Sequence, residues 1–551
     1  MKNIRKQAIL ITLTIIFALI ICGTVSATSY TDIYVSPTGN DSYDGGDPLH
    51  PAQTIKHALG VTKDKGSTIH LANGIYSGTG NTRINLLKNM TIKGQSQTGT
   101  IINGTNTNWI FYISNDITVT IQNLTLTKGT SNAGGAIRNG GTLKVTDTTF
   151  NGNTATLYGG AIYNTDTSTV TGCTFTGNNA PKGGAIFSQD TLTVTSSTFT
   201  GNTATNYGGA IYNTNNLTVK CSTFTNNDAT GNYPANGGAI YNEKIMTVAG
   251  STFTKNNADY GGAIYNYGGT STTPVTISSS TFTGNAATHL GGAIYNTVGT
   301  VNVYFSRIVG NSASQGRGIY DDGGNADAPF NWWGDNNGPA GKVQGLTVIK
   351  WLILTINAAS SSVQTNKNSK IIADLRYDNS GTIHTDRYIP NEIVVKFTTT
   401  RGTIIPQSLT VNGIAQSTLK AGLTTGIASV LAKLDNQTIS KSVNIIDTIA
   451  PKVISTYPKK NAKKVSKTKT IIIKFSEKIK KSTKWSKIYV KNKYGKVKIT
   501  KKWVSGNKIY IKTKKRISKK YYTVYIPVSA VKDYTGNKLT KKYTFKFKTR
   551  K

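Results

Sequence analysis

Acidic side chains are the residues of this chain best suited to acid–base chemistry, but their spacing does not favour it. A glycoside hydrolase needs two carboxyl groups about 5–9.5 Å apart. Asp321 and Asp322 are adjacent, so on a strand they would face opposite ways, and turn chemistry suits them better. The other acids of the repetitive region lie at unequal places in their repeats: Asp147, Asp166, Asp190, Asp228, Glu243 and Asp259. No GxSxG nucleophile motif occurs. We therefore predict no catalytic residue, no cofactor and no enzymatic activity.

A cluster of three aspartates near the N-terminus is the best candidate for binding a metal ion. Asp41, Asp44 and Asp47, with Asn40, offer hard oxygen ligands at short spacing, as Ca²⁺ requires. The spacing is not that of an EF-hand, however, and a turn rich in Gly and Asp explains it equally well. The five histidines show no metal-ligand spacing. We predict no metal site and keep the three aspartates as a calcium alternative.

Five tyrosines recur at one position of a repeated motif and are the candidate binding residues. Each follows an isoleucine in the sequence GGAIYN, so if the isoleucine points inward the tyrosine points outward. An aromatic ladder of this kind could stack on sugars or bind protein. The alternative is that the rings only shield the sheet from water. The five are Tyr163, Tyr212, Tyr241, Tyr265 and Tyr295.

The motif that carries these tyrosines repeats along the middle of the chain. GGAI followed by two residues occurs at 134–139, 159–164, 183–188, 208–213, 237–242, 261–266 and 291–296, and a worn copy, GRGIYD, occupies 316–321. A period of about 24 residues indicates stacked units, none of which can bury its apolar face alone. The glycine pair supplies bends that a Cβ atom would obstruct. A helical repeat is the alternative, but helical periodicity is missing.

Each repeat also contains the pattern TFxxN and a short alternating stretch between the two motifs. Alternation with β-branched neighbours is typical of strands, and we expect about three short strands per repeat. Such repeats build the coils of a right-handed parallel β-helix. Two internal stacks follow, and the asparagine of TFxxN should bond from coil to coil. The isoleucine stack is Ile137, Ile162, Ile186, Ile211, Ile240, Ile264 and Ile294, and the phenylalanine stack is Phe150, Phe175, Phe199, Phe224, Phe253 and Phe282.

The pair of motifs resembles the repeat of polymorphic outer-membrane proteins, which also occurs in adhesin-like surface proteins of prokaryotes. The match covers about residues 134–321. Upstream, residues 33–59 resemble the opening of many secreted β-helix proteins, and downstream, NWWGDNNGP at 331–339 resembles the segment that closes such helices. The resemblance implies a secreted or surface-attached β-helix with an adhesive or structural role, and it implies no particular ligand.

The N-terminal segment resembles a secretory signal. Lys2, Arg5 and Lys6 precede an apolar run, and Val25-Ser26-Ala27 forms a small-residue cleavage site. We expect a signal peptide over 1–27 and a β-helix over 28–345. An uncleaved anchor is the alternative, and we predict no other contact with a membrane. Cys173 and Cys221 lie at different offsets from their phenylalanines, so we expect them to face opposite ways and not to be bridged.

Two further β-rich regions follow. Residues 346–446 have the strand spacing of a β-sandwich and loosely resemble the bacterial Ig-like modules of surface adhesins. Residues 447–551 form a second, lysine-rich sandwich, because residues 450–479 resemble the Ig-like domain of S-layer and other surface proteins. The expected fold class is therefore all-β: a right-handed parallel β-helix followed by two Ig-like β-sandwich domains.

Most of the net charge of +39 lies in the last region. Residues 447–551 contain 34 Lys and Arg against Asp447, Glu477 and Asp533, a net charge of +31. Three interpretations compete: attachment to an anionic envelope polymer or surface glycan, solubility and protection of sheet edges, and nucleic-acid binding. Secretion and the scarcity of Arg argue against nucleic acid.

These observations together predict a secreted, adhesin-like protein of the cell surface or cell wall, in which a β-helix stalk presents a repetitive face. Its partners would be an envelope polymer or surface glycan, or the surface of a host or neighbouring cell. Two alternatives stay open. One is a polysaccharide-active β-helix enzyme, a lyase or hydrolase, and the other is a purely structural envelope protein.

Overall fold

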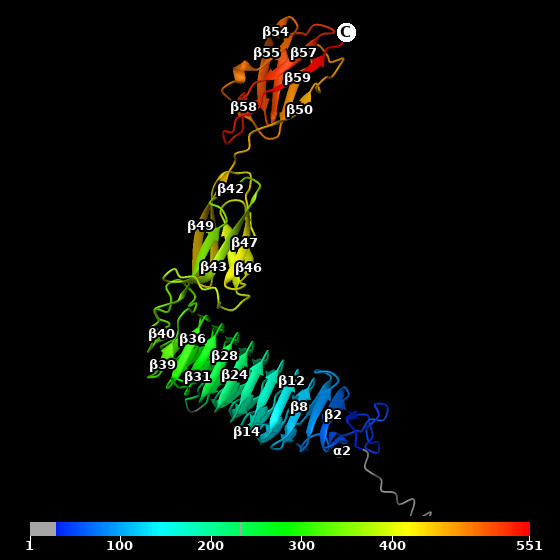
Figure 1. The fold of residues 1–551 in the computed structure, drawn as a ribbon, viewed down its shortest axis with the longest axis vertical. Helices are drawn as coiled ribbons and strands as arrows, with labels where there is room; N and C mark the ends of the chain where they lie inside the picture. Colours follow the sequence, from blue (N-terminus) through cyan, green and yellow to red (C-terminus); the bar gives the residue numbers. More distant parts are fainter. Residues whose placement is uncertain (1–28, 232–233) are drawn as a thin grey trace, which may run out of the picture.

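The computed structural model describes residues 29–231 and 234–551, so the predicted signal peptide at 1–27 lies outside the described residues. The described chain is almost entirely β (Figure 1). A parallel β-helix is followed by two β-sandwiches, each with its own apolar core. The sequence-based limits at residues 345 and 446 fall between β40 and β41 and between β49 and β50. One short helix, α2 (Ile55–Gly60), lies at the N-terminal end, and the side chain of Thr54 caps it.

The four sheets of the β-helix run along its length, and each coil contributes one strand to each sheet that it reaches. Pairing is parallel throughout. The longest sheet holds β1 (Asp32–Val35), β2 (Lys65–Leu71), β5 (Asn89–Gly94), β8 (Thr118–Gln122), β12 (Thr142–Thr146), β16 (Ser168–Thr171), β20 (Leu192–Thr195), β24 (Asn216–Lys220), β28 (Ile245–Ala249), β32 (Val275–Ser278), β36 (Thr300–Tyr304) and β39 (Asn325–Asp327).

The second and third sheets carry the isoleucine and phenylalanine motifs. The isoleucine sheet holds β4 (Ile84–Leu86), β7 (Phe111–Ile113), β11 (Ile137–Asn139), β15 (Ile162–Asn164), β19 (Ile186–Ser188), β23 (Ile211–Asn213), β27 (Ile240–Asn242), β31 (Ile264–Asn266), β35 (Ile294–Asn296), β38 (Ile319–Asp321) and β40 (Val343–Gln344). The phenylalanine sheet holds β3 (Gly74–Ser77), β6 (Thr100–Asn103), β9 (Thr125–Thr127), β13 (Thr149–Asn151), β17 (Thr174–Thr176), β21 (Thr198–Thr200), β25 (Thr223–Thr225), β29 (Thr252–Thr254), β33 (Thr281–Thr283) and β37 (Arg307–Val309).

A fourth sheet corrects the expectation of three strands per repeat. It spans only the central coils and consists of β10 (Thr130–Ala133), β14 (Thr154–Tyr158), β18 (Asn179–Lys182), β22 (Thr203–Tyr207), β26 (Asp228–Ala229), β30 (Asn257–Tyr260) and β34 (Ala286–Leu290). Most of its strand pairs contain register shifts, and in most of its strands only one alanine, such as Ala204, is buried. A strand with a single buried alanine shows almost no alternation of apolar and polar residues, so the sequence does not indicate it.

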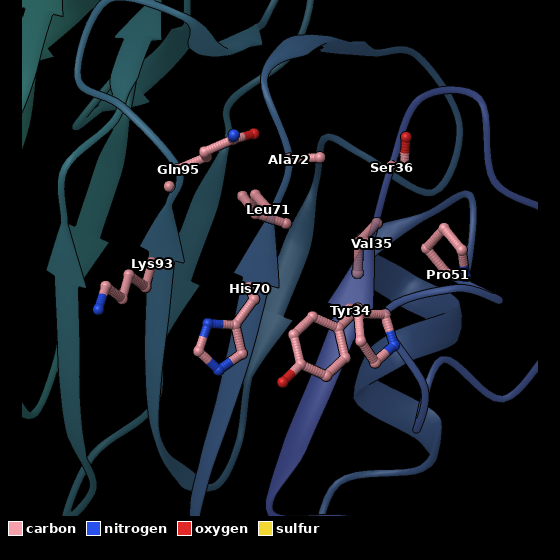
Figure 2. Close-up of a pocket in the computed structure, with 11 residues that line it drawn as sticks. Tyr34, Val35, Ser36, Pro51, His70, Leu71, Ala72, Lys93 and Gln95 are labelled. Carbon is pink, nitrogen blue, oxygen red and sulfur yellow. The ribbon is translucent and has the colours of Figure 1, made fainter.

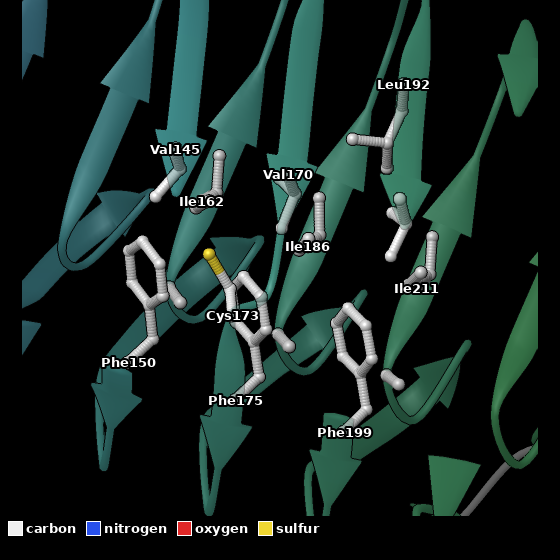
Figure 3. Packing of buried hydrophobic residues seen from close by; sticks show 14 of the residues in the cluster. Val145, Phe150, Ile162, Val170, Cys173, Phe175, Ile186, Leu192, Phe199 and Ile211 are labelled. Carbon is white, nitrogen blue, oxygen red and sulfur yellow. The ribbon is translucent and has the colours of Figure 1, made fainter. Parts of the chain in front are cut away.

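The two predicted stacks are confirmed (Figure 3). Ile162 pairs in register with Ile186, and Ile186 with Ile211, and all seven isoleucines are fully buried. The phenylalanine rings stack at centroid distances of 4.5–4.8 Å, from Phe150 to Phe282. Cys173 is buried beside this stack, whereas Cys221 is exposed, and both thiols are free. The one-residue difference in their offsets therefore sends them to opposite faces, as expected.

The glycine pair has a different task at each of its two positions. Gly208 has a φ of +64°, and a Cβ atom there would lie 2.2 Å from the carbonyl oxygen of Ile211. A Cβ atom on Gly209 would lie 2.1 Å from the carbonyl oxygen of Gly238 in the next coil. The first glycine thus permits the left-handed turn, and the second permits the close approach of two coils.

Two ladders of buried asparagines connect the coils. In the ladder from the TFxxN motif, Asn202 donates its amide to Oδ1 of Asn227 at 2.9 Å and to the carbonyl of Phe175 at 3.0 Å. Its backbone N–H also donates to Oδ1 of Asn227. This ladder was predicted. A second ladder from the GGAIYN motif was not, and it runs through contacts such as Asn213 to Asn242 at 2.7 Å.

The second ladder is broken where the repeat reads GGAIFS. Ser188 replaces the asparagine there, and its hydroxyl donates to the carbonyl of Asp190. Asn164 still donates to the Ser188 hydroxyl at 3.0 Å, but Oδ1 of buried Asn213 is left with no donor. A shorter side chain at one coil therefore leaves an unsatisfied acceptor at the next.

The two sandwiches are antiparallel apart from one parallel pair, β42 with β49. The first holds β41 (Leu352–Ala358), β43 (Asn368–Asp378), β47 (Ile414–Lys420) and β45 (Thr403–Ile404) against β42 (Ser362–Gln364), β49 (Gln437–Ile446), β48 (Gly426–Leu434), β44 (Val394–Thr399) and β46 (Gln407–Leu409). The second holds β50 (Val453–Tyr457), β51 (Ile471–Phe475), β56 (Lys508–Thr513) and β55 (Ile499–Ser505) against β54 (Gly495–Val497), β53 (Tyr489–Asn492), β57 (Tyr521–Ile526) and β59 (Tyr543–Lys548), with η1 (Trp485–Lys487) and the pair β52 (Lys480–Lys481) and β58 (Val531–Lys532) beside them.

The first sandwich is joined to the end of the β-helix by a partly buried polar contact. Asp435 accepts hydrogen bonds from the Arg307 guanidinium and, at 2.7 Å, from the indole N–H of Trp332. Trp332 and Phe305 from the last coils belong to the apolar core of this sandwich. The NWWGDNNGP segment therefore closes the helix and forms the junction.

Removing one asparagine of the first ladder should destabilise the β-helix. Asn202→Ala deletes two donors and removes one of the two acceptors of the Asn178 side-chain amide, which keeps only the carbonyl of Phe150, so we expect a loss of about 2–4 kcal/mol. The measurement is the free energy of unfolding from a urea titration followed by circular dichroism. Asn151→Ala, at an exposed position, is the matched control. Equal effects of the two substitutions would contradict the ladder's role.

Restoring the second ladder should stabilise the β-helix. Ser188→Asn places an amide where Oδ1 of Asn213 lacks a donor, and we expect a gain of about 1 kcal/mol in the free energy of unfolding. The same titration measures it. Destabilisation by this substitution would mean that the site cannot accept the longer side chain.

Candidate binding surfaces

The five candidate tyrosines form one continuous ladder on the outer side of the isoleucine sheet. Their rings stack, for example Tyr212 on Tyr241 at 4.8 Å and Tyr241 on Tyr265 at 5.0 Å. Phe187 fills the place between Tyr163 and Tyr212, and Tyr320 extends the ladder beyond Tyr295. They point away from the isoleucines, as the alternation predicted.

These tyrosines are nevertheless largely covered. Tyr212, Tyr241 and Tyr295 expose only 5%, 9% and 5% of their surface, and Tyr163 and Tyr265 are half-buried. The cover is a second tier of side chains from the fourth sheet, chiefly Tyr158, Lys182, Tyr207 and Tyr260. Burial on this scale fits the alternative that the rings shield the sheet, and their role in binding stays a prediction.

The hydroxyl groups of the ladder bond to acids and amides of neighbouring coils. Tyr212 donates to Glu243, Tyr295 donates to Asp322 at 2.6 Å, and Tyr163 donates to Gln189 at 3.0 Å. Burial raises the pKa of Tyr265 to about 12 and raises the pKa of Tyr212 and Tyr295 as well, the last two with help from their carboxylate partners. Two acids of the β-helix, Glu243 and Asp322, therefore bond to the tyrosine ladder.

The three aspartates of the calcium alternative each have hydrogen-bond partners within the protein. The carboxylates of Asp41, Asp44 and Asp47 do not gather within 4.8 Å of one another. Asp41 accepts hydrogen bonds from the backbone of Gln53 and Thr54, Asp44 from Tyr30 and Gly46, and Asp47 from Leu49 and His50. Asp47 bonds within its own turn, as Asx turns do, whereas Asp41 bonds to residues 53 and 54, and Asp44 bonds both to Gly46 and to the distant Tyr30.

A hollow that the sequence did not indicate lies at the N-terminal end of the longest sheet (Figure 2). Tyr34, His70 and Lys93 occupy one register row across β1, β2 and β5, and the hollow measures about 410 Å³. Tyr34 stacks on His70 at 5.0 Å, and His70 bonds to Asp32 at 2.8 Å. Of the described residues that line it, none is acidic, so it does not supply the carboxylate pair of a hydrolase.

The lysine-rich sandwich has almost no counter-charge on its surface. Among the described residues, none of its 34 Lys and Arg side chains lies within 4.0 Å of a carboxylate. Its three acids, Asp447, Glu477 and Asp533, gather within 4.8 Å of one another. Burial and the two neighbouring carboxylates raise the pKa of Glu477. The sequence could not show this cluster, because the three residues are far apart along the chain.

Two family models match this chain. The Chlamydia polymorphic membrane protein repeat matches residues 147–165, 172–189, 196–214, 250–267 and 279–297, and the bacterial Ig-like domain matches residues 447–549. The resemblance of the repeats to polymorphic outer-membrane proteins and the resemblance of residues 447–551 to an Ig-like domain are thereby confirmed. The chain therefore combines a parallel β-helix, whose repeats match the polymorphic membrane protein repeat, with a region at 447–549 that matches the bacterial Ig-like domain. No curated protein matches it.

Solved structures resemble only part of this chain, and only weakly. The adhesin InvE of Yersinia pseudotuberculosis is 16% identical over 36% of this chain and 58% of its own, with a TM-score of 0.21. Invasin, a bacterial integrin-binding protein, is 13% identical over 36% of this chain and 40% of its own, with a TM-score of 0.24. A titin fragment reaches a TM-score of 0.21 at 13% identity over 36% of this chain and 97% of its own. These scores are too low to bear on function.

Within residues 29–231 and 234–551, no helix has the length and apolar composition that a membrane crossing requires. The predicted signal or anchor segment lies before these residues.

The buried ladder should make the β-helix sensitive to alkali. Tyr265 titrates near its ordinary pKa of 10.0 when unfolded and near about 12 when folded, because burial favours the neutral ring. The neutral Tyr265 ring thus contributes its full stabilisation of the folded state below pH 10, and this contribution is lost as the pH rises from 10 to 12. We expect Tyr265→Phe to raise the pH midpoint of alkaline unfolding, measured by circular dichroism. Tyr267→Phe, at an exposed tyrosine, is the control, and an equal shift there would contradict the assignment.

Proposed function

We propose that this chain is a secreted, adhesin-like protein of the cell surface, with no enzymatic activity. In this proposal the β-helix is a stalk that presents a repetitive lateral face. The lysine-rich C-terminal domain holds the protein at an anionic envelope polymer or surface glycan. The surface of a host or neighbouring cell is the partner of the stalk. The family of the repeats and the lack of an aligned row of acids support it.

The observation that carries the proposal is the separation of charge along the chain. The last 105 residues have a net charge of +31, whereas the first 446 have only +8. A strongly positive module on a nearly neutral rod produces a directed field that attracts polyanions to one end. A charge excess needed only for solubility would be expected over the whole surface.

Attachment through this module should depend on salt and on the last domain. We expect full-length protein to remain with the cell fraction at about 0.15 M salt and to be released at about 1 M, where charges are screened beyond roughly 3 Å. A version that ends at Ile446 should appear in the medium at either salt. Immunoblots of washed cells and medium measure both. Equal retention of the two versions would show that the lysine-rich domain is not the anchor.

A further inference from the structure

A groove lined by lysines lies along one edge of the C-terminal sandwich. It is formed where β53, β54 and β57 of one sheet meet β55 of the other, next to η1, and it measures about 850 Å³. Five lysines line it: Lys484, Lys487, Lys496, Lys501 and Lys502. Among the described residues that line it, none is acidic, because the three acids of the domain cluster elsewhere.

Among the described residues, no carboxylate lies within 4.0 Å of the lysines of this groove. Lys502 is half-buried, and its ammonium group donates to the carbonyl oxygens of Trp485 at 2.8 Å and Ser486 at 3.2 Å. Burial and the nearby charge of Lys481 lower the pKa of Lys502. An anion in the groove would relieve this repulsion, and a concave wall of one charge concentrates the field that attracts it.

Two tyrosines on the same wall point to a ligand with rings as well as charges. Tyr489 and Tyr525 stack at a centroid distance of 4.7 Å and an angle of 20°, and both line the groove. The ammonium group of Lys496 lies 5.0 Å from the ring of Tyr489. The C–H faces of a sugar ring are apolar and stack on such rings, while its acidic substituents pair with ammonium groups.

We propose that this groove binds a segment of an acidic polysaccharide, with the tyrosines stacking on its sugar rings and the lysines pairing with its carboxylates or other anionic groups. A flat membrane surface fits a concave groove poorly, and a nucleic acid would favour Arg, which is rare in this domain. The inference rests on the proposed envelope association and assigns it to one site.

The test compares two full-length variants with the same change in charge. Lys484→Gln/Lys487→Gln/Lys501→Gln removes three exposed groove charges. Lys459→Gln/Lys460→Gln/Lys463→Gln removes three exposed charges beside the opposite sandwich edge, formed by β50 and β59. The probe is immobilised polygalacturonate, with neutral dextran as the blank. We expect the groove variant to bind about tenfold more weakly, a loss of about 1.4 kcal/mol spread over three exposed ion pairs, and the control variant to bind nearly as well as the parent protein.

A third variant separates ring stacking from charge. Tyr489→Leu keeps an apolar side chain on β53 but removes the ring. We expect weaker binding to polygalacturonate and unchanged binding to inorganic polyphosphate, which has no sugar ring. Unchanged thermal unfolding of each variant excludes loss of the fold as the cause.

The possible failures of the two proposals are distinct. If the parent protein binds none of the three probes, polygalacturonate, polyphosphate and anionic vesicles, the proposed envelope association itself is wrong. If it binds polygalacturonate but both lysine variants weaken equally, attachment is a property of the whole surface and the groove is not the site. Tighter binding to anionic vesicles or DNA than to polygalacturonate would overturn the ligand class.

Discussion

The constraint on which the rest of the structure depends is the close approach of one coil to the next in strict register. Each coil must present isoleucine to isoleucine, phenylalanine to phenylalanine and asparagine amide to asparagine amide, as Ile186 with Ile211 and Asn202 with Asn227 do. Gly209 permits this approach because it has no side chain where the carbonyl of Gly238 lies. A buried amide is costly unless all its groups are bonded. The ladders therefore stabilise the correct register, and a slip of one residue would leave their amides unbonded.

This constraint also explains why the repeated residues are poor candidates for recognition. The outer ladder of tyrosines follows the same repeat as the inner stacks, but the fourth sheet places Tyr207 and Lys182 over it. Its hydroxyl groups use Glu243 and Asp322 as acceptors, and these acids are then unavailable for other chemistry. The regular side chains therefore hold the coils together, and two of the open hollows lie outside the repeats, at the N-terminal end of the longest sheet and in the last sandwich.

The buried stacks and the first asparagine ladder could be predicted from the sequence, where one residue type recurs at the same position of each repeat. Ile137 to Ile294, Phe150 to Phe282 and the TFxxN asparagines were found in this way, because spacing alone determines their register. The burial of Tyr212 could not be predicted, since the covering Tyr207 belongs to a strand with almost no alternation. The groove could not be predicted either. Alternating lysines indicate an exposed sheet face, but they do not indicate that Lys487 and Lys501 border a hollow.

The distribution of lysines within the last domain bears on what its charge is for. At physiological salt the Debye length is about 8 Å, so lysines spread over a convex surface repel one another only weakly. Their excess then costs little stability, which the apolar core around Ile473 and Phe547 can offset. Repulsion is greater in a groove, where several lysines line the same open hollow and Lys502 is partly withdrawn from water. Lysines on the convex surface are enough to keep the domain soluble. Solubility therefore does not explain why lysines also line a groove without a counter-charge, whereas binding of an anion does.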